Sequence, residues 1–132
     1  MFRLIISIII GLVLGKERKK HDKSGGGSRT LAIISMASCL IAILTLEIQK
    51  LNPEIFSFSR LMAYGIASIG FLGSSVIIKN KNHIDGTTTA SLVWAIVPVN
   101  YMIGMGFYFY GIISAIFLYF ILESKYMRSN NE

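Results

Sequence analysis

A short polar segment after residue 84 has the residue types and spacing that could carry chemistry. Asp85 precedes Gly86, and three threonines follow, of which Thr88 and Thr89 lie in the first turn of an apolar run. Hydroxyls at a helix start can accept hydrogen bonds from backbone N–H groups that lack a helical partner. The same groups can instead hold an anion or orient a carboxylate such as Asp85 or Glu17. The segment therefore predicts a capped helix start, a polar pocket, or both.

Few other residues could do chemistry. Glu47 ends one apolar run and Arg60 precedes the next, so their charges either reach the membrane interface or form an ion pair. His21 and His83 have no histidine or cysteine at ligand spacing, which indicates no zinc site and leaves the question of any metal open. No nucleophile, base and orienting acid follow a known pattern. We expect neither an enzyme nor a cofactor.

These residues belong to a very apolar chain. Of its 132 residues 53% are hydrophobic and 15% are charged, and its mean hydropathy is +0.60. Soluble domains are less apolar and carry about a quarter charged residues. We therefore expect one membrane domain over residues 1–132, in a bacterial or archaeal cytoplasmic membrane. The net charge of +6 fits basic loops beside anionic membrane lipid, and nucleic acid is not an expected partner.

The lengths of the apolar runs set the number of helices. The run from Thr87 to Leu122 has no formal charge and would be about 54 Å long as one helix, against a hydrocarbon core of about 30 Å. It must contain two helices, and the glycines of Gly104–Gly106 allow a tight reversal between them. The sequence predicts an all-α integral membrane protein with five transmembrane helices, at about 2–16, 31–46, 61–78, 88–103 and 107–122.

The basic residues predict the orientation of these helices. Most of the 13 lysines and arginines lie in the first loop, the third loop and the C-terminal tail. The other side has only Arg3, Lys50 and Arg60. Because cytoplasmic loops are enriched in lysine and arginine, the N-terminus is expected outside and the C-terminus in the cytoplasm.

Small residues form stripes on two of the expected helices. Along the third helix they recur every three or four residues, at Ala63, Ala67, Gly70 and Ser74, with Gly73 beside them. Gly11 and Gly15 repeat the four-residue spacing in the first helix. Such faces let another helix approach closely, which is how helices associate in lipid. The stripes predict packing within the chain, a homodimer through the first or third helix, or contact with another membrane protein.

The segment ASIGFLGSSVIIK, a short polar link and GTTTASLVW resemble the core of the MgtC/SapB family. In that family a GxGFLGAGxI helix leads into GLTTAA and a tryptophan eight residues after its glycine, a spacing that Gly86 and Trp94 keep. The segments GLVLGKER and SRT and the residue before the third helix match further family features, at Gly15, Glu17, Arg29, Thr30 and Arg60. The resemblance covers most of residues 5–120.

The resemblance implies a five-helix inner-membrane protein connected with magnesium homeostasis, growth in low magnesium and, in pathogens, virulence. Here it would be a short form without the family's C-terminal cytoplasmic domain. It also implies functional roles for the motif residues Glu17, Arg29, Thr30, Arg60, Gly70, Gly73, Asp85, Gly86, Thr88, Thr89 and Trp94.

Two functional hypotheses follow from this resemblance. In the first, the chain regulates another membrane complex, such as the ATP synthase, through its small-residue faces. In the second, it is a small oligomeric transporter or channel for Mg²⁺ or H⁺ that uses Arg60, Asp85 and the threonine turn.

Overall fold

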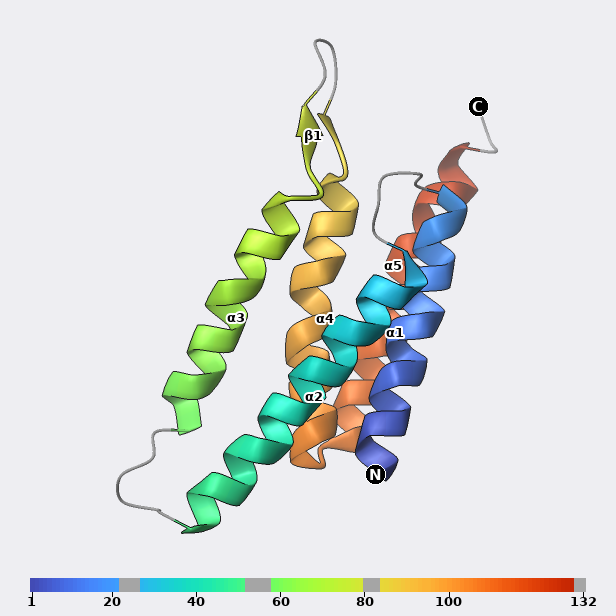
Figure 1. Cartoon of the computed structure of the whole chain (residues 1–132). Coiled ribbons are helices and arrows are strands. Elements are labelled where there is room, and N and C mark those ends of the chain that lie inside the picture. The colour runs from blue at the N-terminus through green and yellow to red at the C-terminus, as the bar shows by residue number, and fades with distance from the viewer. Residues whose placement is uncertain (22–26, 52–57, 80–83, 130–132) are drawn as a thin grey trace.

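The structure, a computed structural model, describes residues 1–21, 27–51, 58–79 and 84–129. In these residues the chain forms five helices, which are α1 (Phe2–His21), α2 (Ser28–Leu51), α3 (Phe58–Ser74), α4 (Thr87–Met105) and α5 (Tyr108–Ser129) (Figure 1). Two short antiparallel strands, β1 (Ile78–Lys79) and β2 (Ile84–Asp85), form a hairpin between α3 and α4. The predicted helical class is confirmed, and the hairpin is an addition to it.

Four of the helices are longer than predicted. Helix α1 continues to His21, beyond the predicted end at residue 16. The added residues are mostly lysine, glutamate and arginine, which favour helix formation, so the polarity that ends the apolar run does not end the helix. Helix α2 likewise extends to Ser28 and Leu51. The glycine- and serine-rich segment at residues 23–28 has the composition of a flexible connector, and its residues 23–26 lie outside the described residues.

The predicted end of the third helix was wrong. Helix α3 ends at Ser74 rather than at residue 78. The hydroxyls of Ser74 and Ser75 donate to the carbonyls of Phe71 and Leu72, at 2.8 and 2.7 Å, and such local bonds compete with regular structure. Three β-branched residues follow, and their restricted χ1 angles favour an extended backbone.

The surface of the fold is apolar. Helices α2 and α4 are each long and apolar enough to cross a membrane, and α5 has a shorter apolar stretch at Tyr108–Ser124. Large apolar side chains elsewhere are exposed, among them Phe71 (79%) on α3 and Phe109 (70%) and Phe117 (63%) on α5. Exposed apolar surface of this extent is typical of membrane or protein contact.

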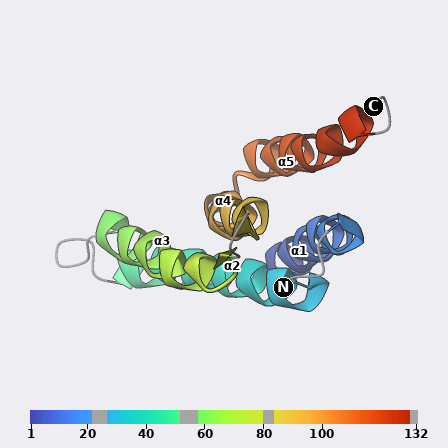
Figure 2. The same cartoon turned by 90° about the horizontal axis from the view of Figure 1, so that it is seen from above.

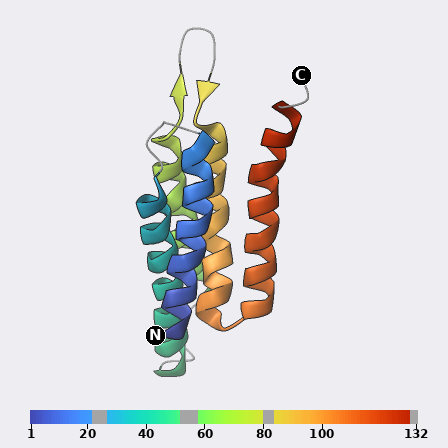
Figure 3. The ribbon, with the colours of Figure 1, turned by 90° about the vertical axis from the view of Figure 1, so that its right-hand side faces the viewer.

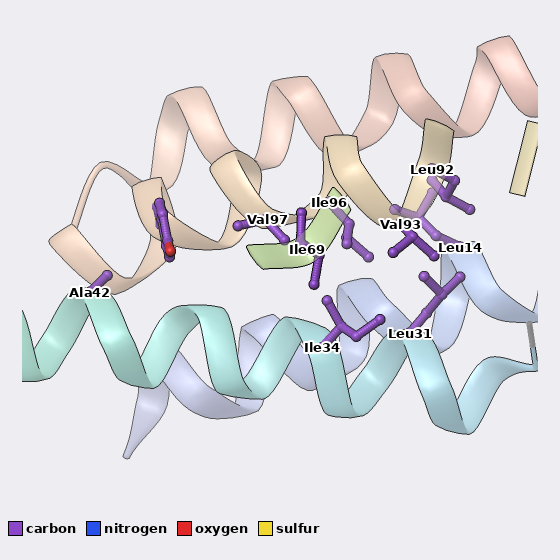
Figure 4. Close-up of a cluster of buried hydrophobic side chains, with 10 residues drawn as sticks. Leu14, Leu31, Ile34, Ala42, Ile69, Leu92, Val93, Ile96 and Val97 are labelled. Atoms are coloured by element: carbon purple, nitrogen blue, oxygen red, sulfur yellow. The ribbon is translucent and has the colours of Figure 1, made fainter. Parts of the chain in front are cut away.

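Helices α1, α2 and α4 form the centre of the fold, and the long α2 crosses it diagonally (Figure 1). Seen from above, α3 and α5 lie on different sides of α4 (Figure 2), and α5 stands beside α1 and α4 (Figure 3). Side chains from α1, α2, α3 and α4 form the core (Figure 4). Its buried members are Leu14, Leu31, Ile34, Ala42, Ile69, Leu92, Val93, Ile96, Val97 and Tyr101.

Glycines bring α1 and α2 into backbone contact. A Cβ atom added to Gly11 would lie 2.6 Å from Ser35 Oγ, and one added to Gly15 would lie 2.5 Å from Ser28 Cα. Neither distance leaves room for a side chain. The small-residue spacing in the first helix therefore packs this helix against α2.

Polar side chains also connect the central helices. The Ser7 hydroxyl of α1 is within hydrogen-bonding distance of two acceptors, the Ser35 carbonyl oxygen of α2 (2.6 Å) and Asn100 Oδ1 of α4 (2.7 Å). At one end of the bundle, Arg3 donates to the Gly104 carbonyl (2.8 Å) and to the Tyr108 hydroxyl (3.1 Å). These bonds tie α1 to α2, to α4 and to the start of α5.

Candidate functional site

The motif around Gly86 forms the turn from the hairpin into α4. Gly86 has a positive φ of 83° and precedes the helix without a side-chain cap, and its carbonyl accepts from the N–H of Ala90 at 2.8 Å. A Cβ atom at Gly86 would collide with the Val76 carbonyl oxygen. Glycine is therefore required by both the backbone angle and the close approach.

The N-cap residue of α4 is Gly86, so the three threonines lie inside the first turn of the helix and not at the cap position. Thr89 is 1% exposed, and its hydroxyl accepts a hydrogen bond from Arg18 Nε of α1 at 2.7 Å. Thr88 is half-buried, and the carbonyl of Thr87 accepts from the Ser91 hydroxyl at 2.9 Å. Thr89 therefore faces the neighbouring helix α1.

The two carboxylates considered for a polar pocket lie in different environments. Glu17 is 5% exposed on α1, next in sequence to the Arg18 that binds Thr89. Asp85 is exposed on strand β2. Arg18, which was not among the residues predicted from the sequence, thus joins α1 to α4.

The remaining predicted polar residues lie at helix starts. Arg29 and Thr30 are exposed in the first turn of α2. Arg60 is exposed in the first turn of α3, at the opposite end of that helix from the hairpin that carries Asp85 (Figure 1). Glu47, near the end of α2, forms an ion pair with Lys50 at 2.8 Å in place of the alternative pair with Arg60.

An open groove of about 390 Å³ lies between α3 and α4 near the hairpin. Its lining consists of the glycines and Ser74 of the α3 motif, Ile77, and one face of α4, namely Gly70, Gly73, Ser74, Ile77, Ala90, Ser91 and Trp94. Trp94 is 52% exposed. We call this the α3–α4 groove, and it contains four of the residues predicted from the sequence to be important.

The glycines of the groove differ in their surroundings. A Cβ atom at Gly70 would meet no atom within 4 Å, whereas one at Gly73 would lie 3.5 Å from the Ala90 carbonyl. Ala63 and Ala67 are exposed and continue the α3 stripe beyond the groove. Gly73 alone among these residues is buried, against α4. The exposed rest of the stripe leaves its surface open among the described helices.

Ala90 and Ser91 line the groove and were not predicted from the sequence. Both lie on the α4 face that carries Trp94, at three- and four-residue spacing before it, and helical periodicity could have found them. Within the four described ranges, no three His, Cys, Asp or Glu side chains come together as a metal site.

Comparison with known proteins identifies relatives over most of the chain. The sequence model described as the MgtC family matches residues 4–129. The chain is 30% identical to Protein SapB of Bacillus subtilis over 128 residues, which are 93% of this chain and 55% of that protein. It is 31% identical to the Escherichia coli K12 protein named "Putative magnesium transporter YhiD" over 127 residues, 93% of this chain and 59% of that protein.

A third relative is Protein MgtC of Salmonella typhimurium LT2, 26% identical over 106 residues, which are 80% of this chain and 43% of that protein. The chain spans about half the length of the curated relatives it matches. No solved structure matches it. Because the family match includes α1, the α3–α4 groove and the turn at Gly86, the chain belongs to the MgtC family.

Proposed function

We propose that this chain is a multi-pass protein of a bacterial or archaeal cytoplasmic membrane and that all five helices cross it. The apolar surfaces of α1, α3 and α5 support this arrangement, since exposed phenylalanines and isoleucines there would otherwise face water. Lys16, Arg29 and Lys79 lie at the same end of the bundle, where α1 ends, α2 begins and the hairpin protrudes (Figure 1). This basic end is the cytoplasmic one, with the N-terminus outside.

We further propose that the chain regulates another membrane complex by binding a helix of that complex in the α3–α4 groove. The observation that carries this proposal is the open groove itself, lined by small residues and flanked by the half-exposed Trp94. In lipid no hydrophobic force drives helices together, so affinity comes from close packing on small residues and from aromatic anchors. The unpacked stripe at Ala63 and Ala67 extends the same surface.

Magnesium homeostasis is the physiological setting that we propose, because a relative is named as a putative magnesium transporter. The partner is a membrane complex whose activity must change when magnesium is scarce, and the ATP synthase, whose substrate binds magnesium, is our first candidate. A second copy of this chain is the other candidate occupant, since a stripe of small residues also supports homodimers.

Replacing Gly70 by leucine tests the proposal. Because a Cβ at Gly70 meets nothing within 4 Å, the larger side chain fills the α3–α4 groove without disturbing the fold. We expect co-purification of the partner complex from mildly solubilised membranes to be lost. The matched control is Ala37→Leu, which adds bulk at an exposed position of α2 outside the groove and should retain the partner. Equal recovery of the partner complex with Gly70→Leu and Ala37→Leu would refute the proposal. Co-purification of two differently tagged copies of this chain would show that the partner is a second copy.

Transport is a second candidate function, favoured by the name of the Escherichia coli relative. It predicts Mg²⁺ or H⁺ flux into vesicles that contain only the purified protein, and loss of that flux in Arg60→Ala. Regulation predicts flux no higher than in protein-free vesicles. Flux that Arg60→Ala removes, from protein with normal helicity, would replace regulation by transport as the proposed function.

A further inference from the structure

A second groove, of about 280 Å³, lies on the other side of the molecule between α1 and α5. One wall carries Ile9 and Val13 of α1, and the other carries Ile112 and Ile116 of α5. These four side chains are 42–52% exposed. Apart from the Tyr119 hydroxyl, the lining residues are aliphatic or aromatic hydrocarbon. We call this the α1–α5 groove, and its walls match the hydrocarbon of a lipid chain.

Contacts at one end of the groove fix how the two helices are aligned. The rings of Phe2 and Tyr108 meet edge to face at 6.2 Å, and Arg3 donates to the Tyr108 hydroxyl. Both helices run away from this contact in the same direction (Figure 3). Because each residue adds about 1.5 Å along a helix axis, Lys16 of α1 lies level with Leu122, next to Glu123 of α5.

Charged residues therefore meet the open end of the α1–α5 groove. Lys16 is exposed and lies seven residues after Ile9 and three after Val13, so it continues the α1 wall. The stretch from Ile9 to Lys16 is about 10 Å long, which places the groove within one leaflet of a core about 30 Å thick. Tyr119 lies near this end, where a tyrosine ring can sit between hydrocarbon and headgroups.

We propose that the α1–α5 groove binds one phospholipid of the cytoplasmic leaflet, with an acyl chain against Ile9, Val13 and Ile116 and the phosphate at Lys16. The inference rests on the proposed membrane insertion and is independent of the α3–α4 groove. Hydrocarbon walls explain the acyl chain, and the lysine at the headgroup level supplies the complementary charge for phosphate. The bound lipid fills the space between α5 and α1, and so holds α5 against the bundle.

Photocrosslinking tests this site with the full chain in bilayer nanodiscs. The probe is a phosphatidylglycerol with a diazirine on its acyl chain, and the labelled residues are identified by mass spectrometry. We expect label concentrated at the residues that line the groove, which are 9, 10, 13 and 14 of α1 and 112, 115, 116, 119 and 120 of α5. Ala115→Phe places a ring in the groove and should abolish this label, whereas Ala37→Phe at an exposed α2 position should keep it. Equal labelling in both variants would overturn the site.

The phosphate contact has its own variants. Lys16→Gln should lower groove labelling about five-fold, the effect expected of one lysine beside a lipid phosphate. Lys19→Gln removes the same charge from an exposed position one helical turn beyond Lys16, farther from the groove, and should change labelling little. A diacylglycerol probe with the same acyl chain but no phosphate should label the groove as weakly as Lys16→Gln. Equal labelling by the two probes would contradict the assigned headgroup.

The same experiment separates this proposal from membrane insertion. Label at the exposed Phe71 of α3 and Phe117 of α5 that is as strong as in the groove would show an inserted protein without a lipid site. No label at any of these positions would refute insertion. In a separate sample, a bifunctional protein crosslinker that joined two copies through α5 would show that a second copy occupies the groove instead.

Discussion

A Gly104→Leu substitution is expected to lower the free energy of unfolding by about 3 kcal/mol or more, the upper range for overpacking a tight contact. A Cβ atom at Gly104 would lie 2.6 Å from both the Cys39 carbonyl oxygen and the Ala42 Cβ of α2. Neither neighbour can move without separating α2 from α4. Unfolding of the purified protein by increasing mole fraction of SDS, followed by circular dichroism, measures the change.

Gly70→Leu is the matched control, because it makes the same replacement inside a helix where a Cβ meets nothing within 4 Å. It should leave stability unchanged or raise it by up to about 1 kcal/mol, through the higher helix propensity of leucine. If Gly104→Leu and Gly70→Leu unfolded at the same mole fraction of SDS, the contact between α2 and α4 at Gly104 would be wrong.

The second large effect is expected at Gly86. Gly86→Ala should cost about 3 kcal/mol, because alanine disfavours the left-handed region by about 1–2 kcal/mol and its Cβ adds a steric clash. The clash is with the carbonyl of Val76, whose carbon would lie 2.9 Å from the new atom. The hairpin should open as α4 loses its fixed start, and hydrogen exchange at residues 78–79 and 84–85 would report this.

Gly27→Ala provides the comparison for Gly86→Ala. Gly27 also precedes a helix, but a Cβ there meets nothing within 4 Å and no positive φ is required. The free energy of unfolding and the hydrogen-exchange rates of Gly27→Ala should match those of the unaltered chain. Similar losses in the two variants would mean that the turn at Gly86 does not need glycine.

The helical framework was predictable because it depends on local features of the sequence. The uncharged run after Thr87 was too long for one helix, and Gly106, with a φ of 95°, ends α4 where the reversal was expected. The β1–β2 hairpin was not predictable in this way. Each strand is two residues long, too short for an alternating pattern, and the apolar run through Ile78 looked like helix.

The candidate site was predictable in its residues but not in their roles. Gly11 and Gly70 both belong to small-residue stripes, yet Gly11 is pressed against α2 and Gly70 faces open space. The spacing of small residues shows that close approach is allowed, and the tertiary arrangement decides whether a neighbour uses it. The role of Thr89 could likewise not be predicted, because its hydrogen bond to Arg18 depends on how α1 packs against α4.

The most direct test of the proposed regulation is photocrosslinking in native membranes from Ser91, which lines the α3–α4 groove. A photoreactive amino acid at position 91 should give one discrete adduct, identified by mass spectrometry as a membrane protein, and Gly70→Leu should remove it. The same group at Ile121, which is 64% exposed on α5, should not give this adduct. Adducts that were the same from both positions, or that persisted in Gly70→Leu, would contradict partner binding in the groove.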